Sequence, residues 1–207
     1  ILLKKSNTSI LILLIITLFS SKFIKNKKSF TLLRRSILAL LEISKKHFSE
    51  IGKFYSGKEH IKFLNIQLEH FYGPDDDISK FPTFILRSCL NNIDEIKLTP
   101  GEQKRDFIYI DDVVSAYILL LNKYIELTDN YYDIELGSGE AIKIADFVKL
   151  VHKETASTTK FLFGAIPYRE NEVMESKSDI SILKSLGWEP SVSLNEGIRK
   201  IIKEESQ

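Results

Sequence analysis

The sequence contains a single cysteine, Cys89, among its 207 residues, so no internal disulfide can form. A chain without disulfides suits a reducing compartment, and we therefore expect a cytoplasmic location. The apolar neighbours of Cys89, such as Phe84 and Leu90, predict a buried and unreactive thiol. The four histidines are scattered and none lies at metal-ligand spacing from the cysteine, so no metal site is predicted.

The chain also has little excess of charge of either sign. Its 29 basic and 28 acidic residues give a net charge of +1. Proteins that bind nucleic acids or anionic membranes in general carry a basic excess, so neither partner is expected. A hydrophobic content of 43% is enough for a sizeable core. The length fits one domain of moderate size or a fragment of a larger one.

Glycine is absent before Gly52, and residues 1–36 differ from the rest of the chain. The run 10–19 is almost wholly apolar, but it is shorter than the ~20 residues that span a bilayer. No small-residue cleavage site follows it. A signal-peptide core, a membrane anchor and a buried strand are alternatives for this run. We expect an atypical segment that results from a truncated or frameshifted gene.

From about residue 37 onward the pattern alternates between helix and strand periodicity. Helices are predicted at 37–57, 79–91, 113–123, 144–153, 179–186 and 194–204. Strands are predicted at 61–68 (buried, because it has few polar residues), 107–110, 131–136, 141–143 and 160–163. This alternation predicts an α/β fold.

The stretch from Gly101 to Asp112 combines a turn, a β-favouring run and two aspartates that can cap the next helix. Arg105 lies just before the predicted strand. A guanidinium in that place can bind a phosphate through two parallel hydrogen bonds, although a solvated surface charge is the alternative.

The string Arg105–Asp112, read R-D-F-I-Y-I-D-D, closely resembles a segment of the extended short-chain dehydrogenase/reductase superfamily, the nucleotide-sugar epimerases, dehydratases and reductases. Four further segments resemble that superfamily in the same order, at 44–48, 68–74, 132–139 and 186–190. The resemblance implies part of a Rossmann-type doubly wound sheet plus a small C-terminal α/β substrate domain. Residues 37–123 would be the remainder of the dinucleotide-binding domain, interleaved with substrate-binding parts. Residues 124–207 would be the nucleotide-sugar-binding region.

In that superfamily a Tyr and a Lys four residues apart on one helix face carry the proton transfer. Lys45 matches the Lys, but Leu41 stands at the Tyr position and cannot transfer a proton. Lys45 and Leu68 would contact NAD or NADP. The glycine-rich loop that receives the cofactor pyrophosphate has no counterpart here, so we expect no tight cofactor binding by this chain.

The substrate side of the resemblance is better preserved. Its residues are His70, Lys80, Phe81, Arg105, Phe107, Arg169 and Glu172. Arg105 and Arg169 would clamp the diphosphate, and Glu172 would lie near the nucleotide ribose. Most of these residues also have an alternative role without ligand binding. The alternatives are a structural role for His70, a plain amphipathic helix at Lys80 and Phe81, a core position for Phe107 and a surface charge at Arg169.

The resemblance implies a reductase that acts on the 4-keto group of a CDP-linked deoxyhexose. A related nucleotide-sugar epimerase or dehydratase, or a binding remnant without catalysis, are the alternatives. The helix that carries Lys45 would form a homodimer interface, or else a surface that a missing domain leaves exposed.

Overall fold

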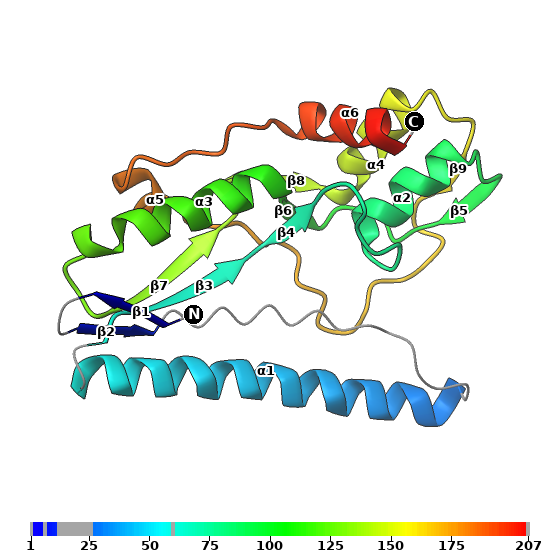
Figure 1. The fold of residues 1–207 in the computed structure, drawn as a ribbon. Coiled ribbons are helices and arrows are strands. Elements are labelled where there is room, and N and C mark those ends of the chain that lie inside the picture. Colours follow the sequence, from blue (N-terminus) through cyan, green and yellow to red (C-terminus); the bar gives the residue numbers. More distant parts are fainter. Residues whose placement is uncertain (1, 6–7, 12–26, 59–60, 206–207) are drawn as a thin grey trace. The chain divides into compact units, whose positions relative to one another are not determined.

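The structure is a computed structural model that describes residues 2–5, 8–11, 27–58 and 61–205. The chain divides into two compact units (Figure 1). Unit 1 contains residues 1–65 and 124–133, and unit 2 contains residues 66–123 and 134–207.

Unit 1 contains a short hairpin and a long helix. Strands β1 (Leu2–Lys5) and β2 (Thr8–Leu11) pair in antiparallel fashion, and helix α1 runs over Lys27–Lys58. The predicted start of this helix at residue 37 is wrong, because the helix begins ten residues earlier. Residues 27–36 contain no Pro or Gly and are rich in Leu, Arg and Lys, which favour helix. Residues 12–19 of the apolar run lie outside the described residues.

Aromatic packing holds α1 in place within unit 1. Phe63 stacks on Tyr131 with ring centroids 5.9 Å apart, and Phe48 of α1 tilts against Phe63 at 5.6 Å. A Cβ on Gly52 would lie 2.4 Å from the Phe63 ring. The glycine therefore permits the close approach of helix and strand. The 3-10 turn η1 (Tyr124–Glu126) completes the unit.

Two strands run from unit 1 into unit 2 and pair with each other, β3 (Phe63–Leu68) and β7 (Tyr131–Leu136). Phe63 N donates to Asn130 O and Glu69 N donates to Leu136 O. Both bonds keep the same sequence offset, so the strands are parallel. The prediction that this first strand is buried is wrong, because only Phe63 of β3 is buried and its end at Leu68 is exposed. A run with few polar residues is therefore not sufficient to predict that a strand is buried.

The sheets of unit 2 lie around β6 (Lys104–Tyr109). β6 pairs in parallel with β4 (His70–Tyr72) and in antiparallel fashion with β8 (Ala141–Lys143). A second parallel pair joins β5 (Glu95–Lys97) to β9 (Lys160–Leu162). The helices are α2 (Phe81–Leu90), α3 (Ile110–Lys123), α4 (Ile144–Glu154), α5 (Ser181–Ser185) and α6 (Leu194–Glu205). The α/β fold class predicted from the sequence is confirmed.

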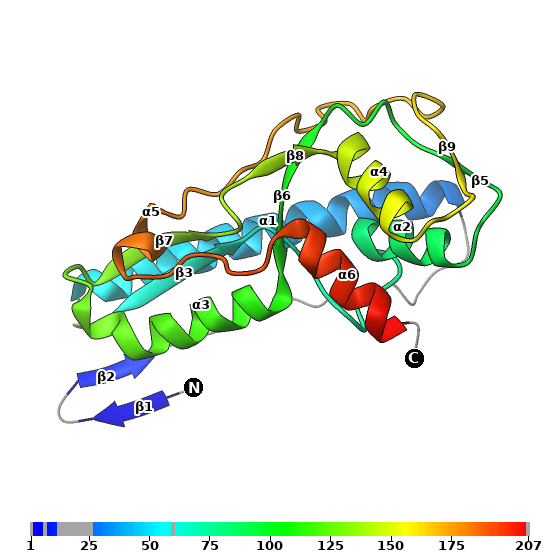
Figure 2. The same cartoon turned by 90° about the horizontal axis from the view of Figure 1, so that it is seen from above.

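The main core lies where α2, α4 and α6 pack on β4 and β6, and Figure 2 shows the three helices on the same side of β6. Phe107 of β6 stacks on Phe147 of α4 with centroids 4.5 Å apart. Cys89 of α2 is 1% exposed in this core, which confirms that it is buried. Burial raises the pKa of the Cys89 thiol, as expected for an unreactive cysteine.

The first turn of α3 differs from the prediction that an aspartate caps a helix beginning at residue 113. The helix begins at Ile110, so Asp111 and Asp112 lie inside its first turn. The buried Asp112 carboxylate accepts hydrogen bonds from Ser191 N, Ser191 Oγ and Val192 N at 2.7 to 3.0 Å. Asp112 therefore fixes the loop that leads into α6.

Asp106, in the middle of β6, is fully buried. Its Oδ1 accepts from Ser138 N at 2.7 Å and Ser138 Oγ at 2.6 Å, and its Oδ2 accepts from Gly139 N at 3.0 Å and Ser178 N at 3.2 Å. A Cβ on Gly137 would come within 2.5 Å of Asp106 Oδ2 and 2.2 Å of Ser178 Oγ. The turn 137–139 and the backbone near residue 178 are thus held against β6.

We expect Asp106→Asn to lower the free energy of unfolding by about 3 kcal/mol, because an amide NH2 would face backbone N–H donors in a site without water access. Chemical denaturation would measure the change. Asp111→Asn is the matched control, since the Asp111 side chain is 64% exposed and pairs with Lys200 at 3.2 Å. Equal stability of the two variants would contradict a structural role for the buried carboxylate.

Candidate functional site

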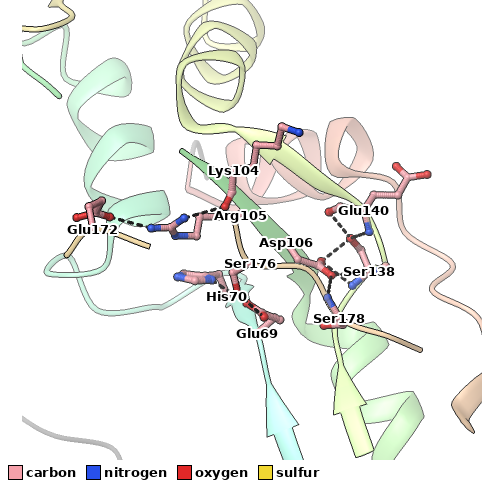
Figure 3. A network of polar contacts seen from close by, with 11 residues as sticks. Glu69, His70, Lys104, Arg105, Asp106, Ser138, Glu140, Glu172, Ser176 and Ser178 are labelled. Atoms are coloured by element: carbon pink, nitrogen blue, oxygen red, sulfur yellow. Dashed lines mark hydrogen bonds and ion pairs between the residues drawn. The ribbon is translucent and has the colours of Figure 1, made fainter. Parts of the chain in front are cut away.

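The predicted phosphate ligand Arg105 lies at the beginning of β6 with its side chain only 12% exposed. Its Nη2 donates to Glu172 Oε1 at 2.8 Å, and its Nη1 donates to the backbone oxygen of Lys104 at 2.8 Å. Figure 3 shows the guanidinium between these two partners. Two residues that the sequence assigned separately, one to a diphosphate and one to a ribose, therefore contact each other.

A tight turn places Glu172 against Arg105. Glu172 N donates to Arg169 O at 3.2 Å, and Asn171 adopts a positive φ of 62°. Asn tolerates this left-handed conformation better than most residues, so the turn is encoded locally.

The segment that follows the turn pairs with the beginning of β6. Lys104 N donates to Met174 O at 2.8 Å, and Ser176 N donates to Lys104 O at 3.2 Å. Tyr168, ahead of the turn, accepts a hydrogen bond from Glu102 N at its hydroxyl. We call residues 168–178 the strap. The strap is held to β6 and its preceding loop by bonds along its whole length, ending at Ser178 on Asp106.

Arg169 differs from Arg105 in its surroundings. It is exposed. Within the described part of the chain its guanidinium forms no hydrogen bond or ion pair, whereas Arg105 is paired. The Arg169 guanidinium can thus bind an anion without first losing a partner from the described part of the chain. The Arg105 guanidinium is already paired with the Glu172 carboxylate.

His70 and Phe107 are partners in the β4–β6 register, with their rings in a T-shaped contact at 5.9 Å. Phe107 is 6% exposed and stacks on Phe147, which matches the core role left open by the sequence. The His70 side chain is 47% exposed. Alternate residues of a strand share a face, so Arg105 lies on the same face of β6 as Phe107. His70 and Arg105 therefore present polar groups on one side of this sheet.

Lys80 and Phe81 lie at the beginning of α2. Lys80 Nζ pairs with Asp76 Oδ1 at 2.8 Å and stands 3.8 Å from the centroid of the Phe71 ring. Phe81 is half-buried and packs against Phe147 at 6.0 Å. These contacts fit the plain amphipathic helix as well as a nucleotide contact, so the substrate role of both residues stays a prediction.

The residues predicted to serve catalysis and the cofactor are divided between the units. Lys45 is an exposed residue of α1 in unit 1, and Leu68 is at the exposed end of β3 in unit 2. Leu41 is in α1, but its side chain lies outside the described residues. The roles of these three residues stay predictions.

Three residues of this region escaped the sequence reasoning. Asp106 stands next to Arg105, but a lone aspartate in a strand gave no signal of burial. Glu69 and Ser176 contact each other at 2.6 Å across 107 residues of chain. No short-range pattern connects residues that are so far apart.

Neither a metal site nor a membrane span is found in the described ranges. No group of three or more His, Cys, Asp or Glu side chains gathers there as metal ligands would. None of the helices in these ranges has both the length and the hydropathy that a bilayer crossing needs.

Comparison with known proteins confirms the family resemblance. Residues 41–134 match the model of the NAD dependent epimerase/dehydratase family. CDP-abequose synthase of Salmonella muenchen is 40% identical over 161 residues, which is 77% of this chain and 54% of that protein. The crystal structure of UDP-glucose 4-epimerase with UDP-glucose from Thermotoga maritima superposes with a TM-score of 0.68 at 26% identity, over 80% of this chain and 53% of that one.

The GDP-mannoheptose C4 reductase of Campylobacter jejuni, solved with NADP bound, shares the fold with a TM-score of 0.64 at 18% identity. It is matched over 77% of this chain and 54% of its own length. The chain thus spans about half the length of the relatives it matches.

Proposed function

We propose, from the match of residues 41–134 to the NAD dependent epimerase/dehydratase family, that this chain binds a nucleotide sugar through Arg105 and Arg169. The observation that carries the proposal is the Arg105 guanidinium, held at the beginning of a strand and already bound to a carboxylate. A carboxylate and a phosphate make the same paired hydrogen bonds with a guanidinium. Arg169, three residues before Glu172 and at the start of the same turn, would add the second charge.

The complete protein, in this proposal, reduces the 4-keto group of a CDP-linked deoxyhexose with NADPH or NADH for a cell-surface polysaccharide. The 40% identity to CDP-abequose synthase supports this choice of substrate. Residues 37–123 would then be the remainder of the dinucleotide-binding domain, interleaved with substrate-binding parts such as Arg105, and residues 124–207 would be the nucleotide-sugar region. Because Leu41 has no proton to exchange, the chain as it stands would bind without turnover.

A second candidate is the epimerisation of a UDP-sugar, which the similarity to the Thermotoga maritima epimerase favours. Calorimetric titration of the full chain with CDP and with UDP separates the two. Tighter binding of CDP supports the reductase, and tighter binding of UDP supports the epimerase.

We expect Arg105→Ala to weaken CDP binding at least tenfold, since it removes a charge-assisted pair of hydrogen bonds to the diphosphate. Arg199→Ala is the matched control, because Arg199 is a 63% exposed arginine of α6 that likewise pairs with a glutamate, Glu154. Isothermal titration calorimetry measures both variants. Equal affinities in the two would refute the role of Arg105, and absence of binding by the unmodified chain would refute the proposed function.

Substitution of Glu172 separates its observed contact with Arg105 from its proposed contact with the ribose. In Glu172→Gln the carboxylate no longer competes for Arg105, so inorganic pyrophosphate is expected to bind about threefold tighter at low salt. If Glu172 also accepts hydrogen bonds from a ribose, CDP will gain less than pyrophosphate or will bind more weakly. Glu175→Gln is the control. The Glu175 side chain is 57% exposed, and its Oε1 lies 3.6 Å from Lys104 Nζ, a longer ion pair than that of Glu172 with Arg105. Weaker pyrophosphate binding by Glu172→Gln would mean that Glu172 orients Arg105 rather than competing for it.

The outer surface of α1 supports the predicted homodimer. Five large apolar side chains of this helix are about half exposed or more, namely Leu40, Ile43, Ile51, Phe54 and Tyr55. Such a stripe on one helix is typical of a surface covered by a partner. We expect Ile51→Lys to shift a dimer to monomer in sedimentation velocity, whereas Glu50→Lys, at the adjacent exposed position, leaves it intact. A monomeric unmodified chain would reject the homodimer.

A further inference from the structure

Glu69, just ahead of β4, is an acidic residue that is mostly shielded from solvent. Its side chain is 20% exposed, whereas the surface glutamates Glu102 and Glu175 are 58% and 57% exposed. Its backbone is fixed on both sides, because Glu69 N donates to Leu136 O and Glu69 O accepts from Phe71 N, each at 2.9 Å. The carboxylate therefore has a defined position.

Two side chains converge on the Glu69 carboxylate (Figure 3). The hydroxyl of Ser176 donates to Oε1 at 2.6 Å, and Nδ1 of His70 lies 3.2 Å from Oε2. Ser176 is itself held by its backbone bond to Lys104 on β6. Ser176 of the strap thus fixes one oxygen of the Glu69 carboxylate, and the other oxygen fixes the His70 ring.

The chemistry of a carboxylate decides the state of the imidazole. An ionised carboxylate only accepts hydrogen bonds, so His70 must donate through an Nδ1–H. In the neutral ring the other nitrogen, Nε2, is then a hydrogen-bond acceptor. A side chain that stays 47% exposed while one nitrogen is fixed in this way has the other nitrogen to offer to a ligand.

The face on which His70 lies gives the ligand its chemical class. His70 shares this face of the sheet with Arg105, whose guanidinium extends to the same side in Figure 3. A neutral Nε2 acceptor repels phosphate oxygens, which carry no hydrogen, but accepts from a hydroxyl group. A ligand with an anionic part for Arg105 and a hydroxyl group for His70 matches both residues.

We propose that Glu69, braced by Ser176, is a positioning residue that holds His70 as the Nδ1–H tautomer, so that Nε2 accepts a hydrogen bond from a hydroxyl group of the bound nucleotide sugar. This inference rests on the proposed function. The hydroxyl group belongs either to the hexose or to the ribose, and the two sources are separable by the choice of ligand.

The tautomer is tested first on the full chain without ligand, by nitrogen-detected NMR of the histidine rings at a pH where they are neutral. His70→Asn identifies the His70 signals by their loss. We expect the Nδ1–H form in the unmodified chain, the Nε2–H form that free histidine favours in Glu69→Ala, and return of the Nδ1–H form in Glu69→Gln, whose amide oxygen can still accept. An Nε2–H form in the unmodified chain would overturn the proposal.

Binding is tested by calorimetry with CDP and with CDP-glucose. Glu69→Ala is expected to weaken CDP-glucose about tenfold. A loss for CDP-glucose alone assigns the hydroxyl to the hexose, and an equal loss for both ligands assigns it to the ribose. Ser176→Ala, a smaller change, is expected to cause a two- to threefold loss and covers the case in which Glu69→Ala does not fold. Glu175→Ala removes a glutamate of the strap, next to Ser176, and is expected to change neither the tautomer nor the affinity.

The failures of the two proposals look different. If the unmodified chain binds neither ligand, the proposed function fails and this inference fails with it. If the unmodified chain binds and Glu69→Ala binds equally well, only the inference fails. A loss in Glu175→Ala as large as in Glu69→Ala would show a general charge effect and would also overturn it.

Discussion

The buried carboxylate of Asp106 is the constraint on which the arrangement of unit 2 depends. A fully buried charge is tolerated only where donors surround it, and Asp106 receives four hydrogen bonds from Ser138, Gly139 and Ser178. Those donors come from the turn between β7 and β8 and from the end of the strap. The Asp106 side chain therefore links β6 to the 137–139 turn and to the end of the strap, although the three segments are distant in sequence.

The candidate site lies on the other face of the same strand. Successive residues of a strand point to opposite faces, so fixing Asp106 on one face fixes Arg105 and Phe107 on the other. The strap, held at Ser178 by Asp106 and at Met174 and Ser176 by Lys104, brings Glu172 to Arg105 and Ser176 to Glu69. Structural and ligand-facing groups thus depend on one hydrogen-bonded strand.

Much of the fold was readable from the sequence. The strands 131–136 and 141–143 are found where hydrophobic periodicity placed them, and α4 and α6 differ by one residue at their ends. Local periodicity reports which face of an element is buried, and this depends mainly on nearest neighbours in sequence. The exposure of β3 and the position of Asp112 inside α3 were missed, because each depends on packing or on a partner elsewhere in the chain. The early start of α1 was missed although residues 27–36 favour helix locally.

By itself the sequence determined the α/β class, the family resemblance and the identity of the charged residues, since motif spacing and periodicity are local properties. It also predicts that Leu41 stands where the family has its tyrosine. Only the tertiary structure decided that Arg105 already has Glu172 as a partner and that Glu69 joins His70 to Ser176. These pairs form between segments up to 107 residues apart, and hydrogen bonds at such a separation are set by the folded path of the chain rather than by any local pattern.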